Sequence, residues 1–423
     1  FTGPLLAHTF PGLPADRLAL AERLFQVPQR LLTRLLTPQG EQRPLSRESG
    51  IGKLTWCLHR ADGQEMSSLY VHQCNRLGLL LIGGMSSMVV SRQMCLGLTL
   101  TVLGPFMTTC LVSAAAGDAP AVDTLTIDAE IKPYGKVSGV SGTINSIGSD
   151  TLNNLITLWA EGFRKQYPNV KIQVEGKGSS TAPPALIENT AQLGPMSRTM
   201  KSSEIDAFEA KFGYPPTAYP VAVDALALFV NKDNPTKGLT IAEVDALFSK
   251  SRRQGHPTDL TRWGQLGHRG DWADAPISLY GRNSASGTYG FFKEHALKNG
   301  DFKDQVKEQP GSASVVQGIN EDRYGIGYSG IGYSTSGVNM VPLAAKAGQP
   351  FVEPTHANTK NGSYPLWRYL YIYVNQAPGK PLSPIVKEFL AYVYSKEGQS
   401  DVLRDGYFPV PGALAEKQLA KIR

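Results

Sequence analysis

"VAVDALALFVN" at residues 221–231 is a nearly continuous apolar run. A run without alternation is typical of a strand that is buried on both faces. Strand-like and helix-like stretches alternate on both sides of it along the chain. This order predicts an α/β fold in layers, with mostly parallel sheets.

The flanking elements follow from hydrophobic periodicity and capping signals. Residues 152–166 carry apolar side chains at helical spacing, and residues 240–248 begin with a Thr240…Glu243 capping box. Residues 170–175 alternate as a strand. The expected strands are 142–147, 170–175, 221–231, 277–280 and 366–374, and the expected helices are 152–166, 182–190, 240–248, 288–297 and 384–394.

The composition is that of an ordinary globular protein. Of 423 residues, 41% are hydrophobic and 18% charged, and the net charge is +6. Residues 1–116 hold 10 Lys and Arg against 6 Asp and Glu, so the remainder is nearly neutral. Such a balance gives no reason to expect nucleic acid as a partner.

The first 116 residues differ from the rest. All four cysteines lie there, and a cysteine-free body suits an oxidising compartment. Residues 1–84 are an upstream extension of doubtful structure with a candidate helix near residues 16–36. They are either translated ahead of the natural start or a genuine, weakly structured extension.

Residues 85–116 are interpreted as a signal peptide. Arg92 supplies the positive charge, residues 95–112 form the apolar run, and Ala114-x-Ala116 fits a signal peptidase site. A transmembrane anchor is the competing interpretation, but the run is short and Gly104-Pro105 breaks it. We therefore expect export to the periplasm, with release from the cell as a further option.

Three strand-to-helix junctions share one chemistry. Each combines Gly with hydroxyl residues before a helix: GSDT at 148–151, GKGSST at 176–181 and RNSASGT at 282–288. Free N–H groups at a helix N-terminus attract an oxyanion, hydroxyls add donors, and Gly permits close approach. A single junction is more often a simple cap. Three in one body, one with an Arg, favour an anion site.

These junctions belong to longer motifs that resemble a known family. Together with LGPMSRTM (193–200), AVDALALFVNKDNP (222–235), WGQLG (263–267) and GIGYSG (325–330), they are similar to the phosphate-binding subunit of the phosphate-specific ABC transporter, the PstS family. The resemblance covers about residues 140–423. It implies that inorganic phosphate is held by hydrogen bonds and one Arg, with no metal and no other cofactor.

The resemblance also implies roles for individual residues. Thr151 would offer its hydroxyl and Leu152 its backbone in the first loop, and Ser179 would act in the second. Arg282 would bring its guanidinium, whose rigid fork of donors suits a tetrahedral oxyanion. The candidate ligand-binding residues are Ser149, Asp150, Thr151, Leu152, Ser179, Ser180, Ser197, Arg198, Asp224, Arg282, Ser286, Gly287 and Thr288.

Two departures from the family put selectivity in question. The relatives carry an Asp where this chain has Ser197; that Asp accepts a hydrogen bond from protonated phosphate and so rejects sulfate, which has no proton to give. Asp150 could take this role, or be a helix N-cap; Asp224 could take it, or be a structural link at the hinge. We prefer Asp150. Arg198 either adds a second cation or pairs with an acidic neighbour, and Ser284 replaces an Asp that steadies the Arg.

By resemblance we expect a two-lobed periplasmic solute-binding fold with a hinge and a central ligand cleft. A polar lead-in at 117–137 would precede lobe one (138–222 plus 342–423) and lobe two (223–341), with hinge crossings near residues 221–224 and 339–342. The closed protein would deliver phosphate to a membrane permease served by an ATPase subunit. We expect a monomer that is not an enzyme.

Other functions have weaker support. The G-x-G-x-x-G match at 325–330 stands alone, and the resemblance makes it a scaffold strand. Ser284 lacks the flanking glycines of a hydrolase nucleophile. The aromatic stripe at 367–373 is interpreted as a strand with aromatics packed across a sheet rather than a stacking platform. The remaining alternatives are a phosphatase-like hydrolase, a surface adhesin on the same fold, and a receptor for sulfate.

Overall fold

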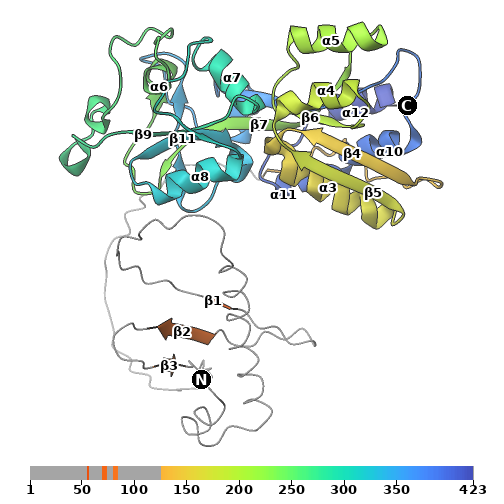
Figure 1. The fold of residues 1–423 in the computed structure, drawn as a ribbon, viewed down its shortest axis with the longest axis horizontal. Helices are drawn as coiled ribbons and strands as arrows, with labels where there is room; N and C mark the ends of the chain where they lie inside the picture. The colour runs from red at the N-terminus through yellow and green to blue at the C-terminus, as the bar shows by residue number, and fades with distance from the viewer. Residues whose placement is uncertain (1–54, 57–68, 74–79, 84–124, 423) are drawn as a thin grey trace, which may run out of the picture. The chain divides into compact units, whose positions relative to one another are not determined.

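The computed structural model describes residues 55–56, 69–73, 80–83 and 125–422 (Figure 1). The expected signal peptide, the candidate helix near 16–36 and all four cysteines lie outside these residues. The chain divides into two compact units, Phe1–Ser113 and Ala114–Arg423. In the first unit, β1 (Thr55–Trp56), β2 (Leu69–Gln73) and β3 (Leu80–Gly83) pair antiparallel.

Strand β7 (Thr217–Asn231) organises the second unit. It is 15 residues long, and every residue from Val221 to Asn231 is buried, as the apolar run predicted. It lies within a seven-stranded sheet of order β10-β9-β11-β7-β14-β6, in which β12 also pairs with β7. The other strands of this sheet are β6 (Gly194–Met196), β9 (Ser278–Arg282), β10 (Lys307–Gln309), β11 (Gly325–Gly330), β12 (Val338–Met340) and β14 (Trp367–Val374).

The expectation of mostly parallel sheets is wrong for this sheet. Strand β7 pairs antiparallel with β11, β12 and β14, and β14 pairs antiparallel with β6. Only β9 makes parallel pairs there, with β10 and β11. A continuous apolar run predicts burial on both faces, but the connections along the chain set the strand direction.

Smaller sheets and the helices complete the unit. Strands β4 (Gly142–Gly148) and β5 (Val170–Gly176) pair parallel and are joined through α3 (Asn153–Gln166); β8 (Leu239–Thr240) pairs parallel with β13 (Leu343–Ala344). The remaining helices are α4 (Ala182–Ile187), α5 (Ser202–Phe212), α6 (Ile241–Phe248), α7 (Gly287–His295), α8 (Ser312–Glu321), α9 (His356–Lys360), α10 (Pro384–Val393), α11 (Lys396–Arg404) and α12 (Gly412–Ile422).

The capping box that opens α6 is confirmed. The backbone N–H of Glu243 donates to Thr240 Oγ1 at 3.2 Å, and the N–H of Thr240 donates to Glu243 Oε2 at 2.7 Å. Each partner thus satisfies a backbone donor that the first helical turn leaves free.

The elements gather into two bodies joined by β7 (Figure 1). Each body has its own core, and the core changes between Ala222 and Val223 on β7. That change supports our first expected hinge crossing. The second crossing was expected near 339–342, but Leu343 and Leu366 pack in the core of the second body and Leu370 packs in that of the first. We therefore propose that the second crossing lies in β14.

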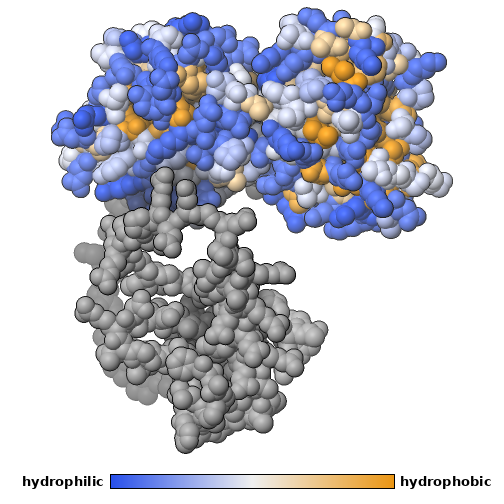
Figure 2. Space-filling model, in the orientation of Figure 1, coloured by the Kyte–Doolittle hydropathy of each residue, from blue (hydrophilic) through white to orange (hydrophobic). Residues whose placement is uncertain are grey.

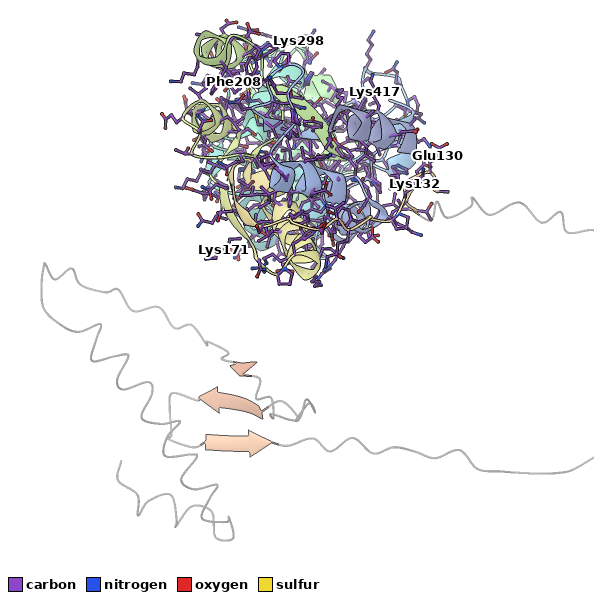
Figure 3. The ribbon with its side chains drawn as sticks, turned by 90° about the vertical axis from the view of Figure 1, so that its right-hand side faces the viewer. Glu130, Lys132, Lys171, Phe208, Lys298 and Lys417 are labelled. Carbon is purple, nitrogen blue, oxygen red and sulfur yellow. The ribbon has the colours of Figure 1, made fainter. Side chains whose placement is uncertain are left out.

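The surface of the described residues is mostly polar on the face that Figure 2 shows, with small scattered apolar areas. Lys132, Lys171, Lys298 and Lys417 are exposed, while Phe208 is buried between α4 and α5 (Figure 3). None of the described helices is both long and apolar enough to cross a membrane.

Phe163 on α3 tests the packing of the first core. Its side chain is fully buried, with ring centroids 4.9 Å from Tyr167 and 5.4 Å from Phe389. We expect Phe163→Ala to lower the free energy of unfolding by about 3–5 kcal/mol, measured by urea denaturation, because it leaves a cavity. Phe351→Ala, at a side chain that is 49% exposed, should cost clearly less. Equal losses would contradict this packing.

Candidate functional site

Five hydroxyl side chains meet where the two bodies face each other; we call them the hydroxyl cluster. Thr151 Oγ1 lies 3.0 Å from Thr288 Oγ1, which lies 3.4 Å from Ser197 Oγ. Ser197 Oγ also lies 3.1 Å from Ser149 Oγ and 3.3 Å from Ser179 Oγ. All five residues are buried. Hydroxyl protons can rotate, so this cluster can turn several donors toward one acceptor.

The three junctions predicted from the sequence bring these hydroxyls together. Ser149 and Thr151 follow β4 in and beside the 3-10 turn η1 (Asp150–Leu152), and Ser179 begins the turn η2 (Ser179–Thr181). Thr288 lies in the first turn of α7, after β9. Ser197 directly follows β6, so a fourth segment completes the cluster.

Glycines allow the second and third junctions to touch. Gly178 has a φ of 113°, and a Cβ there would lie 2.5 Å from the carbonyl oxygen of Ala285. The N–H of Ser180 donates to that same oxygen at 3.1 Å. A Cβ at Gly287 would overlap Ser179 Oγ. Only Gly at these two positions permits so close an approach of the two segments.

Ser286 is the N-cap of α7. Its Oγ accepts hydrogen bonds from the N–H groups of Thr288 at 3.1 Å and Tyr289 at 3.4 Å. This cap sets the helix N-terminus, with its partial positive charge, against the hydroxyl cluster. Gly287 and Thr288, both buried, are the residues of α7 that reach the cluster.

Arg282 ends β9 and is 1% exposed. Its Nη1 donates to Ser312 Oγ at 2.5 Å, and its Nη2 lies 3.2 Å from Asp150 Oδ2. Its Nε is buried and has no acceptor among the described residues. Burial lowers the pKa of Arg282 and the charge of Asp150 raises it, and the guanidinium stays charged at neutral pH. The site therefore contains a buried cation with one unused donor.

Asp150 joins the two bodies. Its Oδ2 accepts the N–H of Ser312 at 2.8 Å in addition to the contact with Arg282. The interpretation of Asp150 as a helix N-cap is wrong: η1 begins at Asp150 itself and Ser149 is its N-cap. The carboxylate points toward Arg282 and pairs with it.

A second buried ion pair is formed by Arg368 and Asp224. Asp224 was a candidate residue, but its pairing with Arg368 was not predicted from the sequence. The two residues lie opposite each other in the register of β14 and β7. Arg368 Nε and Nη2 donate to Asp224 Oδ2 at 2.9 and 2.7 Å. Arg368 also donates from Nη1 to the carbonyl of Ser197 at 2.8 Å and from Nη2 to Thr288 Oγ1 at 3.0 Å. A lone Arg in an aromatic strand was the available signal, because a buried charge needs a partner.

Two tyrosines that were not predicted from the sequence donate hydrogen bonds to the backbone of the first junction, residues 148–151. Tyr333 donates to the carbonyl of Asp150 at 3.0 Å, and Tyr407 donates to the carbonyl of Thr151 at 2.9 Å. Burial raises the pKa of both hydroxyls well above their usual range, so both remain donors at neutral pH. Nothing in their local sequence marks them, because their partners lie far away along the chain.

The other predicted residues lie at the edge of the cluster or behind it. Arg198 pairs with the acidic neighbour Glu204 at 2.7 Å, and its Nη2 donates to Ser180 Oγ at 3.3 Å. Ser180 therefore contacts Arg198 rather than the hydroxyl cluster. Leu152 packs its side chain in the first core, and its expected backbone contact with a ligand stays a prediction.

Comparison with known proteins places this geometry in a family. A model of the PBP superfamily domain matches residues 114–397. The phosphate-binding protein PstS of Pseudomonas aeruginosa is 57% identical over 312 residues, which cover 74% of this chain and 97% of that protein. The chain belongs to the PstS family. The predicted family and the two-lobed fold class are thereby confirmed.

Solved structures agree with this PstS assignment. A protein from Clostridium perfringens, described as a phosphate ABC transporter substrate-binding protein with bound phosphate, is 25% identical with a TM-score of 0.54, covering 64% of this chain and 100% of that one. A protein from Planctomyces limnophilus, described as a possible phosphate-binding protein, is 28% identical with a TM-score of 0.50, covering 67% and 99%.

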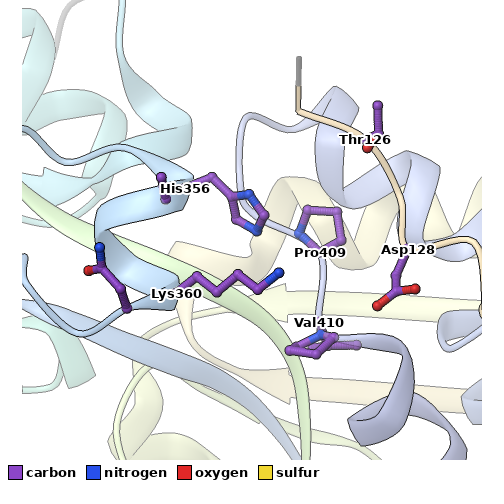
Figure 4. A pocket seen from close by; sticks show the side chains of 9 residues that line it. Thr126, Asp128, His356, Lys360, Pro409 and Val410 are labelled. Carbon is purple, nitrogen blue, oxygen red and sulfur yellow. The ribbon is translucent and has the colours of Figure 1, made fainter. Parts of the chain in front are cut away.

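Two open cavities of this PstS-family chain lie elsewhere among the described residues. One of about 560 Å³ is lined by Asp128, His356, Lys360 and the stretch 409–411 (Figure 4), and another of about 540 Å³ lies between α8 and residues 332–337. Neither is lined by the hydroxyl cluster, whose side chains already touch one another. Within residues 125–422, no group of three or more His, Cys, Asp or Glu is placed to hold a metal ion.

The Arg198–Glu204 pair should make stability depend on pH. Burial alone raises the pKa of Glu204, but hydrogen bonds from Arg198 and the Lys201 N–H, with the charges of both cations, outweigh it and lower that pKa. A lowered folded-state pKa stabilises the protein above the unfolded value of about 4.3 and ceases to do so as pH falls through the folded value.

We therefore expect Glu204→Gln to lower the urea midpoint at pH 7, with the difference from the parent shrinking below about pH 4. Glu416→Gln, at an exposed position on α12, is the matched control and should change little at either pH. A loss for Glu204→Gln that is the same at pH 7 and pH 3.5 would show that the ion pair does not stabilise the fold.

Proposed function

We propose that this protein binds inorganic phosphate in the hydroxyl cluster and carries it to an ABC transporter in the membrane. One observation carries the proposal: five buried hydroxyls from both bodies meet at the N-terminus of α7. The Arg282 guanidinium pairs with Asp150, the residue directly before Thr151 of this cluster. These groups are donors or can act as donors, so the ligand must be rich in acceptors and negatively charged.

Phosphate is the anion that fits best. The relative at 57% identity is described as a phosphate-binding protein, the structure at 25% identity contains bound phosphate, and the one at 28% is described as a possible phosphate-binding protein. A tetrahedral oxyanion offers four oxygens in different directions, and donors here come from four segments of the chain. The Nε of Arg282, which is buried and has no acceptor among the described residues, can add a charged donor.

Asp150 is our proposed acceptor for the hydrogen bond that protonated phosphate donates. Both oxygens of Asp224 are engaged, Oδ2 by Arg368 and Oδ1 by the N–H of Ile331 at 3.0 Å. Both contacts of the Asp150 carboxylate with described residues end on Oδ2. Its Oδ1 can therefore accept a hydrogen bond from a protonated phosphate oxygen, and an unpaired acceptor there disfavours sulfate, which has no proton to donate.

The family and the contacts between the two bodies support a role that includes closure and delivery. Backbone contact of Ser180 with Ala285 and the Asp150–Arg282 pair hold the two sides together, as a closed ligand-bound state requires. We propose that the protein is exported to the periplasm, acts as a monomer, and docks in the closed state on a permease served by an ATPase. It binds its ligand without transforming it, as the substrate-binding proteins among its relatives do.

Removing Arg282 should abolish tight binding. Arg282→Ala removes a buried charge-assisted contact worth about 2–5 kcal/mol, so phosphate affinity should fall by at least about 30-fold. The measurement is titration calorimetry on protein unfolded and refolded to remove carried-over ligand. Arg404→Ala, at an exposed position on α11, is the matched control and should bind as the parent does. Unchanged affinity in Arg282→Ala would refute the site.

Selectivity should depend on Asp150. Because Asp150→Asn also disturbs the ion pair with Arg282, the readout is the ratio of phosphate to sulfate affinity, not either affinity alone. We expect this ratio to fall in Asp150→Asn and to hold in Asp224→Asn. A fall in Asp224→Asn instead would assign the role to Asp224. Sulfate binding by the parent protein with no phosphate binding would make the chain a receptor for a different oxyanion.

A further inference from the structure

Arg368 stands at the place where the two bodies are joined. It lies on β14 opposite Asp224 of β7, and these are the strands in which one core gives way to the other. On β7 the change falls between Ala222 and Val223, directly before Asp224. Its side chain is therefore anchored at the proposed hinge rather than in either body.

From this position one guanidinium reaches both walls of the site. Nη1 donates to the carbonyl of Ser197, which belongs to the side of β6, and Nη2 donates to Thr288 Oγ1 at the start of α7. The donors of a guanidinium are fixed in one plane. Both contacts can form together only when the two walls hold the spacing seen here, in which Ser197 Oγ and Thr288 Oγ1 are 3.4 Å apart.

Asp224 prevents the guanidinium from moving and compensates its charge. The carboxylate is fully buried and takes two N–H groups from Arg368 on Oδ2 and the N–H of Ile331 on Oδ1. The ring of Phe291 lies 5.2 Å from the Arg368 Cζ, so the cation is packed on α7 as well. Arg368 thus differs from Arg282, whose Nε remains unused.

We propose that Arg368 is a positioning residue that stabilises the closed state of the site by holding Ser197 and Thr288 at their closed spacing. This inference rests on the proposed phosphate binding. A residue that favours the closed state acts mainly on ligand release, because release requires opening. Loss of Arg368 should therefore raise the dissociation rate of phosphate, while the association rate changes little.

The test compares Arg368→Met and Arg368→Lys with the parent protein. Dissociation is followed by chasing radiolabelled phosphate with unlabelled phosphate, and affinity by calorimetry. We expect Arg368→Met to dissociate at least about tenfold faster, with an association rate within about threefold of the parent. Arg368→Lys keeps the charge but cannot serve three acceptors in one plane, so its rate should lie between the two.

Controls separate positioning from general stability. Lys303→Met removes another buried cation, one paired with Asp259 at 2.6 Å, and should lower the unfolding temperature without changing phosphate release. If Arg368 acts through Thr288, replacing Arg368 should change the rate of phosphate release less in a Thr288→Val background than in the parent protein. A purely structural role of Arg368 would give additive effects of the two substitutions.

The outcomes are distinct. No phosphate binding by the parent protein would overturn the proposed function itself. Tight binding by the parent with an unchanged release rate in both folded Arg368 variants would overturn this inference alone. Should Arg368→Met fail to fold, Arg368→Lys decides the matter: a release rate equal to that of the parent would contradict positioning by several simultaneous contacts.

Discussion

The need to pair a buried charge governs the centre of this protein. Two of its buried arginines lie beside the hydroxyl cluster, and each has a carboxylate partner: Arg282 with Asp150, and Arg368 with Asp224. An unpaired guanidinium there would cost several kcal/mol, and removing one member of a buried pair is strongly destabilising. One pair bridges the two bodies and the other ties the two crossing strands, so both also fix the geometry of the hydroxyl cluster.

Much of the fold could be predicted from local patterns. The run at 221–231 predicted a buried strand, periodicity predicted α3, and the Thr240…Glu243 box predicted the start of α6. Strand direction and the second crossing could not be predicted this way. Both depend on which distant segments pack together, and residues 343–366 show no composition that assigns them to one core rather than the other.

The candidate site, like the fold, could be predicted only in part from local sequence patterns. The Gly- and hydroxyl-rich junctions, whose local chemistry predicts an anion site, contain Ser149, Thr151, Ser179 and Thr288. The structure brings these four residues together with Ser197. The groups that hold these junctions in place, including Ser312, Tyr333 and Tyr407, act across long sequence separations. Their neighbours in the sequence contain nothing to distinguish them from ordinary core or helix residues.

The charge compensation of the site has a consequence for its surroundings. Each buried arginine has its own carboxylate, so the side chains around the hydroxyl cluster contribute little net charge, and hydrogen bonds rather than a long-range field must retain an anion. Dissolved salt weakens interactions between exposed charges far more than those in a buried, compensated site. We therefore expect a protein built in this way to retain phosphate almost equally well in dilute and in saline media.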